Sequence, residues 1–575
     1  MTRRLVAGLL IGLVVAVLEV MVLTLGSTAA ASGGIVMNAG GAMRLLLAGA
    51  SLGTVYALLF RPTPGSHPEN VMGGLVIGVV TWVVLALSLF PILNAGAPAW
   101  HGDTAARMVP ELIAYVLHGS LTGFLYGLAC ERLRLAPAAT HPAEPAAKTN
   151  VVIVGGGYAG VSAAESLDTA FADDPGVDVW LVSKTNYLVH TPMLSEVSSS
   201  AVNPQHISPP LRTFFRRVNV VQGEVASVDW ARGRVELSPG VRSPHRSLAF
   251  DHLLITTGCV PGFFGNRDIE AHTLTFKSLQ DSIRLRNRII DRFERADFER
   301  DAAKKRQLLT FVVVGGGFAG VELIGGINDF GRGMLPYYPN VAPGDVRFVL
   351  VHPGEVILPE LTDSLGRFAQ EKMAARGVEF IPNKRVTGAE PGMIVIGDES
   401  LAADTVVWTA GNQPNPIVHA LGVELTRRGQ IPVSSDLRSV ENPALWAAGD
   451  CARIPIPNDA GSFYPPTAQH AYREGKLLGR NVVAAIRGTP LQPFDFRTLG
   501  SLAALGHQLA VAEVLGYRFS GFLAWIMWRA IYLSKLPNLE KRLRVLLDWV
   551  LDVFFPPDIV QTMSFDAEPE RDVRS

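Results

Sequence analysis

Long apolar runs are concentrated in the first quarter of the chain. A helix needs about 20 apolar residues to cross the hydrocarbon core of a membrane. Runs close to this length occupy 5–25, 44–60, 71–93 and about 110–130. They predict an all-α, four-helix transmembrane region over residues 1–134. For the first run, which follows the basic start MTRR, a secretory signal is the alternative, but the run exceeds the usual signal core of about 7–15 apolar residues.

Positive charges fall mainly on one side of these runs. The loop at 26–42 has no Lys or Arg, whereas the opposite ends carry Arg3, Arg4, Arg61, Arg132 and Arg134. Because cytoplasmic loops are enriched in Lys and Arg, we expect a multi-pass protein of the cell inner (cytoplasmic) membrane. Both termini and the body of the chain would then lie on the cytoplasmic side, with the lipid bilayer as a partner.

Glycines four residues apart recur in every run and predict close helix packing. A helix face without side chains lets backbones approach, which favours association in lipid. The glycines are Gly8 and Gly12, Gly49 and Gly53, Gly74 and Gly78, and Gly119, Gly123 and Gly127.

Beyond a linker rich in Pro and Ala at 135–149, the pattern changes to short apolar strands that alternate with helical segments. Two segments, VVIVGGGYAG and FVVVGGGFAG, read as strand, glycine turn and helix. Each fits the dinucleotide-binding pattern GxGxxG, in which the glycines permit a tight turn, close approach of a pyrophosphate, and packing of helix on strand. The glycines are Gly155, Gly157 and Gly160, then Gly315, Gly317 and Gly320.

Two such turns predict an α/β fold of tandem Rossmann-like domains that holds two dinucleotides. A bound flavin and a visiting nicotinamide explain the pair most simply. We expect an FAD-binding domain in two parts, 150–307 and 412–499. The NAD(P)H-binding domain would occupy 308–411, and a C-terminal membrane-interface and quinone-side region would occupy 500–575.

Several residues at strand ends are candidates for contact with these nucleotides. HLLITTG and TVVWTAG are apolar strands that end near Thr257, Gly258 and Gly411, where the chain would cross between domains. Asp450 follows another apolar strand and could accept hydrogen bonds from a ribityl chain, although a helix N-cap is the alternative.

An acid about 20 residues after each turn usually binds the adenosine ribose. Ser183, with Lys184 next to it, takes that place after the first turn, and His352 takes it after the second. Because His352 does not repel a 2′-phosphate as a carboxylate would, NADPH stays open beside NADH.

Composition excludes other classes of partner and cofactor. The net charge is −1 and the pI is near 6.9, which does not favour nucleic acid. Cys130, Cys259 and Cys451 form no close pair, so we expect no metal site, iron–sulfur cluster or local redox dithiol.

The order of these motifs resembles the type II NADH:quinone oxidoreductases, also called alternative NADH dehydrogenases. The resemblance covers about residues 150–560 and also rests on the stretches NYLVHTPMLSEV, HISPPLR, GCVPGFFG, AAGDCA and PPTAQHAYREG. It implies non-covalent FAD, oxidation of NADH without proton pumping, and reduction of a membrane quinone.

The resemblance also implies roles for individual residues. Glu322 matches a glutamate near the nicotinamide that is associated with proton transfer, although a first-turn acid favoured by the helix dipole is the alternative. Val225 would present its backbone to the adenine. Ala468 and Gln469 open the family's AQxAxQ stretch, which faces the flavin and the quinone entry, and Arg473 replaces its last glutamine.

The C-terminal region predicts contact with a membrane surface. Residues 522–535 are apolar but too short to span, and Trp525, Trp528 and Tyr532 are types that settle at the lipid–water boundary. Residues 539–555 predict an amphipathic helix with an apolar face of Leu539, Leu543, Leu546, Val550 and Val553. Packing on the body or in a homodimer is the alternative for both segments.

The leading hypothesis is therefore an FAD-dependent NADH:quinone oxidoreductase. Alternatives are an NADPH-preferring quinone reductase and a sulfide:quinone oxidoreductase-like enzyme, although the latter needs cysteines that flank the flavin. A membrane redox sensor is the non-enzymatic alternative.

Overall fold

The computed structural model describes residues 6–17, 46, 49–50, 52–58, 67–89, 109–132, 148–238, 247–457, 459 and 461–561. The chain divides into two compact units, Met1–His141 and Pro142–Ser575. The boundary falls within 135–149, where the sequence predicts a linker.

The first unit is helical wherever it is described. Helix α3 (His67–Thr81) continues as a π-helix (Trp82–Leu89), and α6 spans Val109–Arg132. A Cβ atom on Gly74 would lie 2.0 Å from the carbonyl oxygen of Gly119, and one on Gly12 would lie 2.1 Å from that of Gly49. The helix backbones therefore touch through their glycines, and the close packing predicted from glycine spacing is confirmed at these positions.

The described helices support fewer membrane spans than the sequence predicts. Among the described residues, Leu112–Cys130 is long and apolar enough to cross a membrane, whereas Val6–Val17 and Asn70–Val84 are apolar but shorter. Parts of the predicted spans 5–25, 44–60 and 71–93 lie outside the described residues. The described helices thus support one span and not four.

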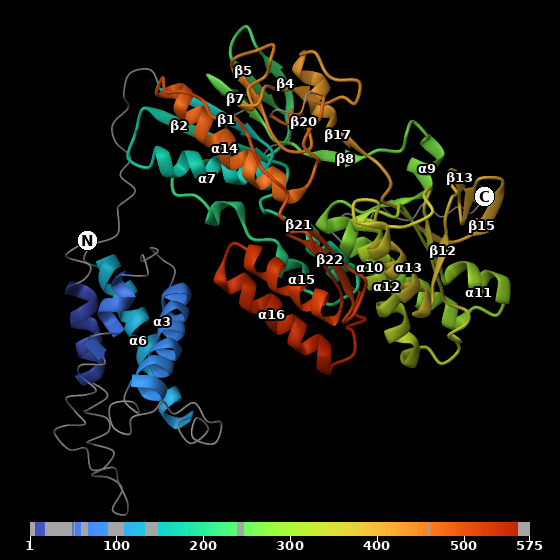
Figure 1. Cartoon of the computed structure of the whole chain (residues 1–575), viewed down its shortest axis with the longest axis horizontal. Coiled ribbons are helices and arrows are strands. Elements are labelled where there is room, and N and C mark those ends of the chain that lie inside the picture. The colour runs from blue at the N-terminus through green and yellow to red at the C-terminus, as the bar shows by residue number, and fades with distance from the viewer. Residues whose placement is uncertain are drawn as a thin grey trace, which may run out of the picture. The chain divides into compact units, whose positions relative to one another are not determined.

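The second unit begins with a five-stranded parallel sheet in the order β19-β7-β1-β2-β3. Its strands are β1 (Thr149–Val154), β2 (Val177–Ser183), β3 (Asn219–Gln222), β7 (His252–Ile255) and β19 (Leu445–Ala447). Helices α7 (Tyr158–Ala170) and α14 (Ala468–Ile486) lie side by side on it (Figure 1).

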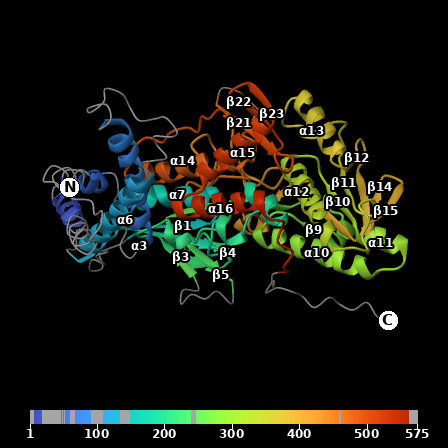
Figure 2. The ribbon, with the colours of Figure 1, turned by 90° about the horizontal axis from the view of Figure 1, so that it is seen from below.

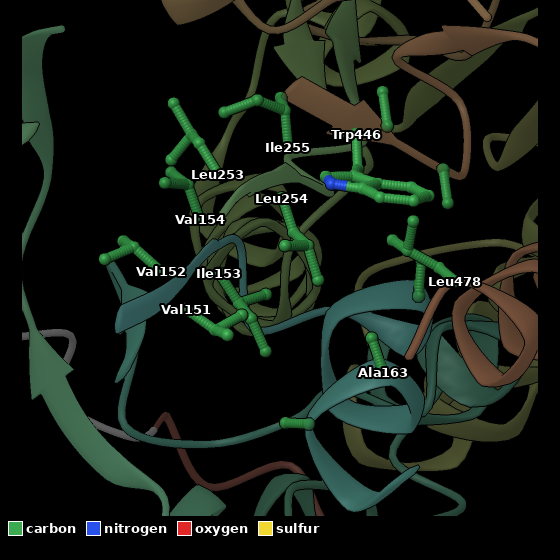
Figure 3. Packing of buried hydrophobic residues seen from close by; sticks show 14 of the residues in the cluster. Val151, Val152, Ile153, Val154, Ala163, Leu253, Leu254, Ile255, Trp446 and Leu478 are labelled. Atoms are coloured by element: carbon green, nitrogen blue, oxygen red, sulfur yellow. The ribbon is translucent and has the colours of Figure 1, made fainter. Parts of the chain in front are cut away.

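The core of this sheet explains the continuous apolar run of β1. Figure 3 shows Val151–Val154 beside Leu253–Ile255 of β7, with Trp446 of β19, Ala163 of α7 and Leu478 of α14 packed nearby. Parallel strands covered on both faces need apolar side chains at successive positions. The first glycine turn follows directly at the carboxyl end of this buried strand.

A second parallel sheet repeats the arrangement in the order β12-β11-β10-β16-β9. Its strands are β9 (Leu274–Thr275), β10 (Thr310–Val314), β11 (Arg347–Val351), β12 (Val378–Ile381) and β16 (Thr405–Trp408), and helix α12 (Phe318–Met334) follows β10. Strands β7-β1-β2-β3 and β16-β10-β11-β12 therefore follow the same plan. The tandem Rossmann-like α/β fold predicted from the two glycine turns is confirmed.

Smaller elements complete the two domains. Each carries a three-stranded antiparallel sheet, and one antiparallel pair, β8 with β17, is formed by the segments that follow β7 and β16. The strands are β4 (Val225–Asp229), β5 (Arg234–Leu237), β6 (Ser247–Ala249), β8 (Cys259–Pro261), β13 (Val386–Glu390), β14 (Met393–Ile396), β15 (Glu399–Ala402), β17 (Asn412–Pro414), β18 (Ile431–Pro432) and β20 (Ala452–Arg453). The remaining helices are α8 (Leu194–Ser198), α9 (Arg267–His272), α10 (Leu279–Phe298), α11 (Ala302–Leu308) and α13 (Asp363–Ala375).

The C-terminal region forms an antiparallel sheet and two helices. It comprises β21 (Gly500–Ala504), β22 (Ala510–Val514), β23 (Tyr517–Gly521), α15 (Phe522–Lys535) and α16 (Leu539–Phe554). Figure 1 shows β21 and β22 between the two parallel sheets, and Figure 2 shows them with β23 and α15 along one edge of the unit. Strand β21 contacts α12 of the second domain, and Gln469 of α14 donates to the carbonyl oxygen of Gly500 at 3.3 Å.

The exposed apolar face predicted for 539–555 is present in α16, whereas the prediction for the tryptophans of α15 is wrong. The predicted apolar face of α16 is exposed at every named position from Leu539 to Val553. The expectation that Trp525 and Trp528 settle at the lipid boundary is wrong, because both are buried in the protein. The residues of α15 that expose their apolar side chains are instead Phe522, Leu523 and Ile526.

Candidate functional site

The first glycine turn leaves no room for a side chain at its last glycine, Gly160. Gly155 has a φ of +114°, which favours glycine. A Cβ atom on Gly160 would lie 1.8 Å from the carbonyl oxygen of Gly155 and 2.7 Å from Oγ1 of Thr256. The Thr256 hydroxyl donates to the carbonyls of Val154 and Gly155 at 3.0 and 3.1 Å, which fastens the turn to β7.

The second turn is closed in the same way. Gly315 has a φ of +121°, and a Cβ atom on Gly320 would lie 1.9 Å from the carbonyl oxygen of Gly315. Thr409 takes the place of Thr256 and donates to the carbonyl of Val314 at 2.8 Å. Two turns with the same closure and the same threonine clamp indicate two cradles of the same kind.

Both cradles fit the pyrophosphate of a dinucleotide. A Cβ atom on Gly157 would have no neighbour within 4 Å, so this face of the turn is open. Helices α7 and α12 begin after Gly157 and Gly317, and neither helix start has a side-chain cap. Their first amide groups are therefore available to an anion, as at other phosphate-binding helix starts.

The predicted strand-end residues of the first cradle lie close to it. Ser183 is buried at the end of β2, and its Oγ would lie 2.5 Å from a Cβ on Gly156. Lys184 is exposed and pairs with Glu224 at 2.8 Å. Val225 opens β4, one residue further on. The fold thus brings Ser183 to the turn and leaves Lys184 at the surface.

The second cradle has one residue that the sequence predicts and one that it misses. His352 Nδ1 accepts a hydrogen bond from the Gly316 amide at 3.2 Å, and burial lowers its pKa, so the ring is neutral. Glu360 was not predicted, yet its Oε1 lies 3.1 Å from the Cβ position of Gly317. The loop after β11 carries Glu360 there because the Leu358 amide donates to the Gly316 carbonyl at 2.7 Å.

The crossing segments between the domains also hold predicted residues. Thr257 and Gly258 follow β7, and Gly411 follows β16. The Gly262 amide donates to the Gly411 carbonyl at 3.1 Å, and that of Asn415 to the Gly258 carbonyl at 3.4 Å. These three residues therefore lie where the two parallel sheets are joined.

Asp450 lies in a cluster of partly buried polar groups. Its Oδ2 accepts from the Cys259 thiol at 2.8 Å and lies 3.8 Å from Lys277 Nζ. Burial raises the pKa of Cys259 to about 12, so the group is a thiol at neutral pH. Glu474 was not predicted, and its carboxylate accepts from the Gly449 amide at 2.8 Å while burial raises its pKa to about 8.

The predicted quinone-side residues lie at the start of α14. Ala468 is its first residue, and Thr467 caps the helix by accepting from the His470 amide. Arg473 donates to the Gln469 carbonyl at 2.9 Å, and its guanidinium lies 4.1 Å from the Phe496 ring centre. Arg473 is therefore packed along its own helix.

Glu322, the predicted catalytic acid, is held by the C-terminal region. Its Oε1 accepts from the Ala504 amide at 3.1 Å and from the Trp528 indole at 2.9 Å. Burial raises its pKa to about 8, so the carboxyl group can gain or lose a proton near neutral pH. No local pattern could identify Trp528 as its partner, because 206 residues separate the two.

Comparison with known proteins places these features in a family context. Residues 149–475 match the model of the pyridine nucleotide-disulphide oxidoreductase family, and residues 499–557 match that of the NDH2 C-terminal domain. The chain is 28% identical over 433 residues to the type II NADH:quinone oxidoreductase Ndh of Mycobacterium tuberculosis, covering 72% of this chain and 90% of that protein. It is 27% identical to the type II NADH:quinone oxidoreductase of Staphylococcus aureus over 390 residues, or 67% of this chain and 94% of that one.

Solved structures show the same fold. The structure of NDH2 from Plasmodium falciparum in complex with NADH is similar with a TM-score of 0.65 at 18% identity, covering 72% of this chain and 100% of that chain. The sulfide:quinone oxidoreductase of Aquifex aeolicus is similar with a TM-score of 0.54 at 16% identity, covering 72% and 96%. At these identities the likeness concerns the fold alone.

Proposed function

Because the chain belongs to the pyridine nucleotide-disulphide oxidoreductase family, and within it to the type II NADH:quinone oxidoreductases, we propose that it oxidises NADH and reduces a membrane quinone by way of FAD. The observation that carries this proposal is the pair of equivalent glycine cradles joined by β8 and β17. When bound, FAD supplies a ring that accepts a hydride and passes on two electrons.

The residues around the first cradle would hold FAD. Gly155, Gly157 and Gly160 would receive its pyrophosphate, with Ser183 and Val225 toward the adenosine. Asp450 would accept hydrogen bonds from the ribityl chain, and Thr257 and Gly258 would line the ring. This assignment divides the FAD-binding domain into 150–307 and 412–499.

The residues around the second cradle, within 308–411, would hold the nicotinamide nucleotide. We propose NADH as the preferred substrate. The relatives that the chain matches are named NADH:quinone oxidoreductases, and the neutral ring of His352 after β11 offers no positive charge to the extra phosphate of NADPH. Gly411 would face the nicotinamide side of the junction.

The quinone would approach from the side of α14 and the C-terminal region. Gln469 bonds to Gly500 and therefore stands where α14 meets β21. The exposed apolar faces of α15 and α16 suit a membrane surface, since contiguous exposed apolar side chains favour an interface. The N-terminal unit, with its candidate span Leu112–Cys130, would add an anchor, and we propose that the body lies on the cytoplasmic side of the membrane.

The cysteines disfavour sulfide as the electron donor. Burial raises the pKa of Cys259 to about 12 and that of Cys451 to about 11, so both are thiols at neutral pH. Attack on sulfur requires a thiolate.

An anaerobic absorbance titration of the full-length protein tests the function. We expect a yellow protein that NADH bleaches at lower concentration than NADPH, that sulfide leaves unchanged, and whose colour a quinone analogue restores. A colourless protein that cannot be reconstituted with FAD would contradict the proposal, as would bleaching by sulfide alone.

A further inference from the structure

A water-accessible cleft lies on the side of Glu322 that faces the C-terminal region. Its volume is about 300 Å³. Residues of α8, α12, α15, α16 and the turn between β21 and β22 line it. The charged or titratable residues among them are Glu196, Glu322, Asp329, Arg332, Arg376, His507, Arg529 and Asp552. Glu322 therefore has a path to solvent that does not pass through either glycine cradle.

Glu196 resembles Glu322 in its surroundings. Its Oε2 accepts from the Trp549 indole at 2.9 Å, as Glu322 accepts from Trp528. Arg529 Nη2 lies 3.9 Å from Glu196 Oε1 and 3.8 Å from Asp552 Oδ2. Two carboxyl groups on the wall of one cleft are thus each held by one indole N–H group.

Both carboxyl groups titrate near neutral pH. Burial raises the pKa of Glu196 to about 7 and that of Glu322 to about 8. Around Glu196, Arg529 and the Trp549 indole lower the pKa, while Asp552 and Asp548 raise it. Glu196 in turn raises the pKa of Glu322. The pair can therefore exchange protons with the cleft under physiological conditions.

Packed aromatic rings lie on the side of Glu322 toward the first cradle. The Trp528 ring lies 4.7 Å from that of Tyr532, and the Tyr532 ring lies 6.1 Å from that of His190. His190 Nδ1 is 2.7 Å from the hydroxyl of Tyr158, the first residue of α7 after Gly157. His190 Nε2 is buried and has no hydrogen-bond partner in the described part of the chain.

Reduction of a quinone by NADH requires a proton from the medium. The hydride brings two electrons and one proton, whereas the quinol carries two protons, so NADH, quinone and one proton yield NAD⁺ and quinol. We propose that Glu196 takes this proton from the cleft and relays it to Glu322. This inference rests on the proposed function and extends it with an entry point for the proton.

Glu196→Gln tests the relay, because the amide can still accept from Trp549 but cannot carry a proton. The matched control is Glu165→Gln in α7, since burial also raises the pKa of Glu165 and it lies outside the cleft. We expect anaerobic bleaching by NADH to keep its rate in both variants. General acid–base groups contribute about 100- to 10,000-fold, and because cleft water can partly bypass the relay, we expect re-oxidation by quinone to slow by about tenfold or more in Glu196→Gln alone.

Two further readouts separate a relay from a structural role. Formate, a weak acid small enough for the cleft, should restore the rate of Glu196→Gln and leave Glu165→Gln unchanged. An infrared difference spectrum can be taken between the resting protein at about pH 6 and at about pH 9. The band of a protonated carboxyl group in this spectrum should be weaker in Glu196→Gln than in the wild-type protein. Wild-type re-oxidation rate and pH profile in Glu196→Gln, or an unchanged infrared band, would overturn the proposal.

Trp549→Phe keeps the proposal testable if Glu196→Gln fails to fold. Loss of the indole donor raises the pKa of Glu196, so the alkaline fall of the re-oxidation rate should move to higher pH, and an unmoved profile would count against the relay. Failure of the proposed function itself looks different, because wild-type protein would then not be re-oxidised by quinone at all.

Discussion

Substitution of the last glycine in each turn tests which cradle holds which nucleotide. In Gly160→Ala the new methyl group would lie 1.8 Å from the Gly155 carbonyl oxygen, and in Gly320→Ala it would lie 1.9 Å from the Gly315 carbonyl oxygen. A non-bonded carbon and oxygen stay about 3 Å apart or more, so each helix must move away from its turn by more than about 1 Å.

The size of the effect follows from this overlap. Overpacking of a tight contact costs about 1–3 kcal/mol. If the turn relaxes by losing its grip on the pyrophosphate, that cost corresponds to about ten- to hundredfold weaker nucleotide binding. Gly160→Ala should therefore lose FAD, whereas Gly320→Ala should keep FAD and need about ten- to hundredfold more NADH for half-maximal bleaching.

The assay is the ratio of flavin to protein absorbance after dialysis, followed by anaerobic titration with NADH. Gly344→Ala is the matched control, because a Cβ atom there would meet nothing within 4 Å. Loss of FAD from Gly320→Ala but not from Gly160→Ala would reverse the assignment of the cradles. If both variants behaved like Gly344→Ala, the steric argument itself would be refuted.

Three other predictions follow from the titrating groups and the exposed helix. Burial raises the pKa of Glu322 from 4.5 to about 8, so the folded protein binds more protons than the unfolded chain in this window and the free energy of unfolding falls as pH rises through it. The Tm of Glu322→Gln relative to wild type should therefore increase from acid to alkaline pH, and a constant difference would contradict the shift. Because Cys259 is a thiol at neutral pH, iodoacetamide should label it far more slowly than free cysteine, as mass spectrometry of the peptide can check. Leu547→Asp and Val550→Asp on the exposed face of α16 should slow reduction of a long-tailed quinone in membranes, with Tm and the rate with a short-tailed quinone unchanged.

The local parts of the two nucleotide cradles were predictable from sequence. A continuous apolar run predicts a strand covered on both faces, and a glycine at the strand end predicts a tight turn. Both features depend on a few neighbouring residues, so the tight turns at Gly155 and Gly315 could be predicted, and the structure gives both glycines a positive φ. The amphipathic period of 539–555 likewise predicted the exposed face of α16.

The partners of the buried acids were not predictable. Tryptophan is typical of the membrane boundary, yet Trp525 and Trp528 of α15 are buried in the protein, where the Trp528 indole donates a hydrogen bond to Glu322. Glu360 reaches the second turn through a loop, and no period marks it.

Sequence alone determined the positions of the two glycine turns, because strand periodicity and glycine conformation are properties of adjacent residues. Tertiary structure alone decided which acids are buried, which indoles bind them and which of them share a cleft. Those relations join residues hundreds of positions apart, and the pKa of each carboxyl group depends on the water that packing excludes.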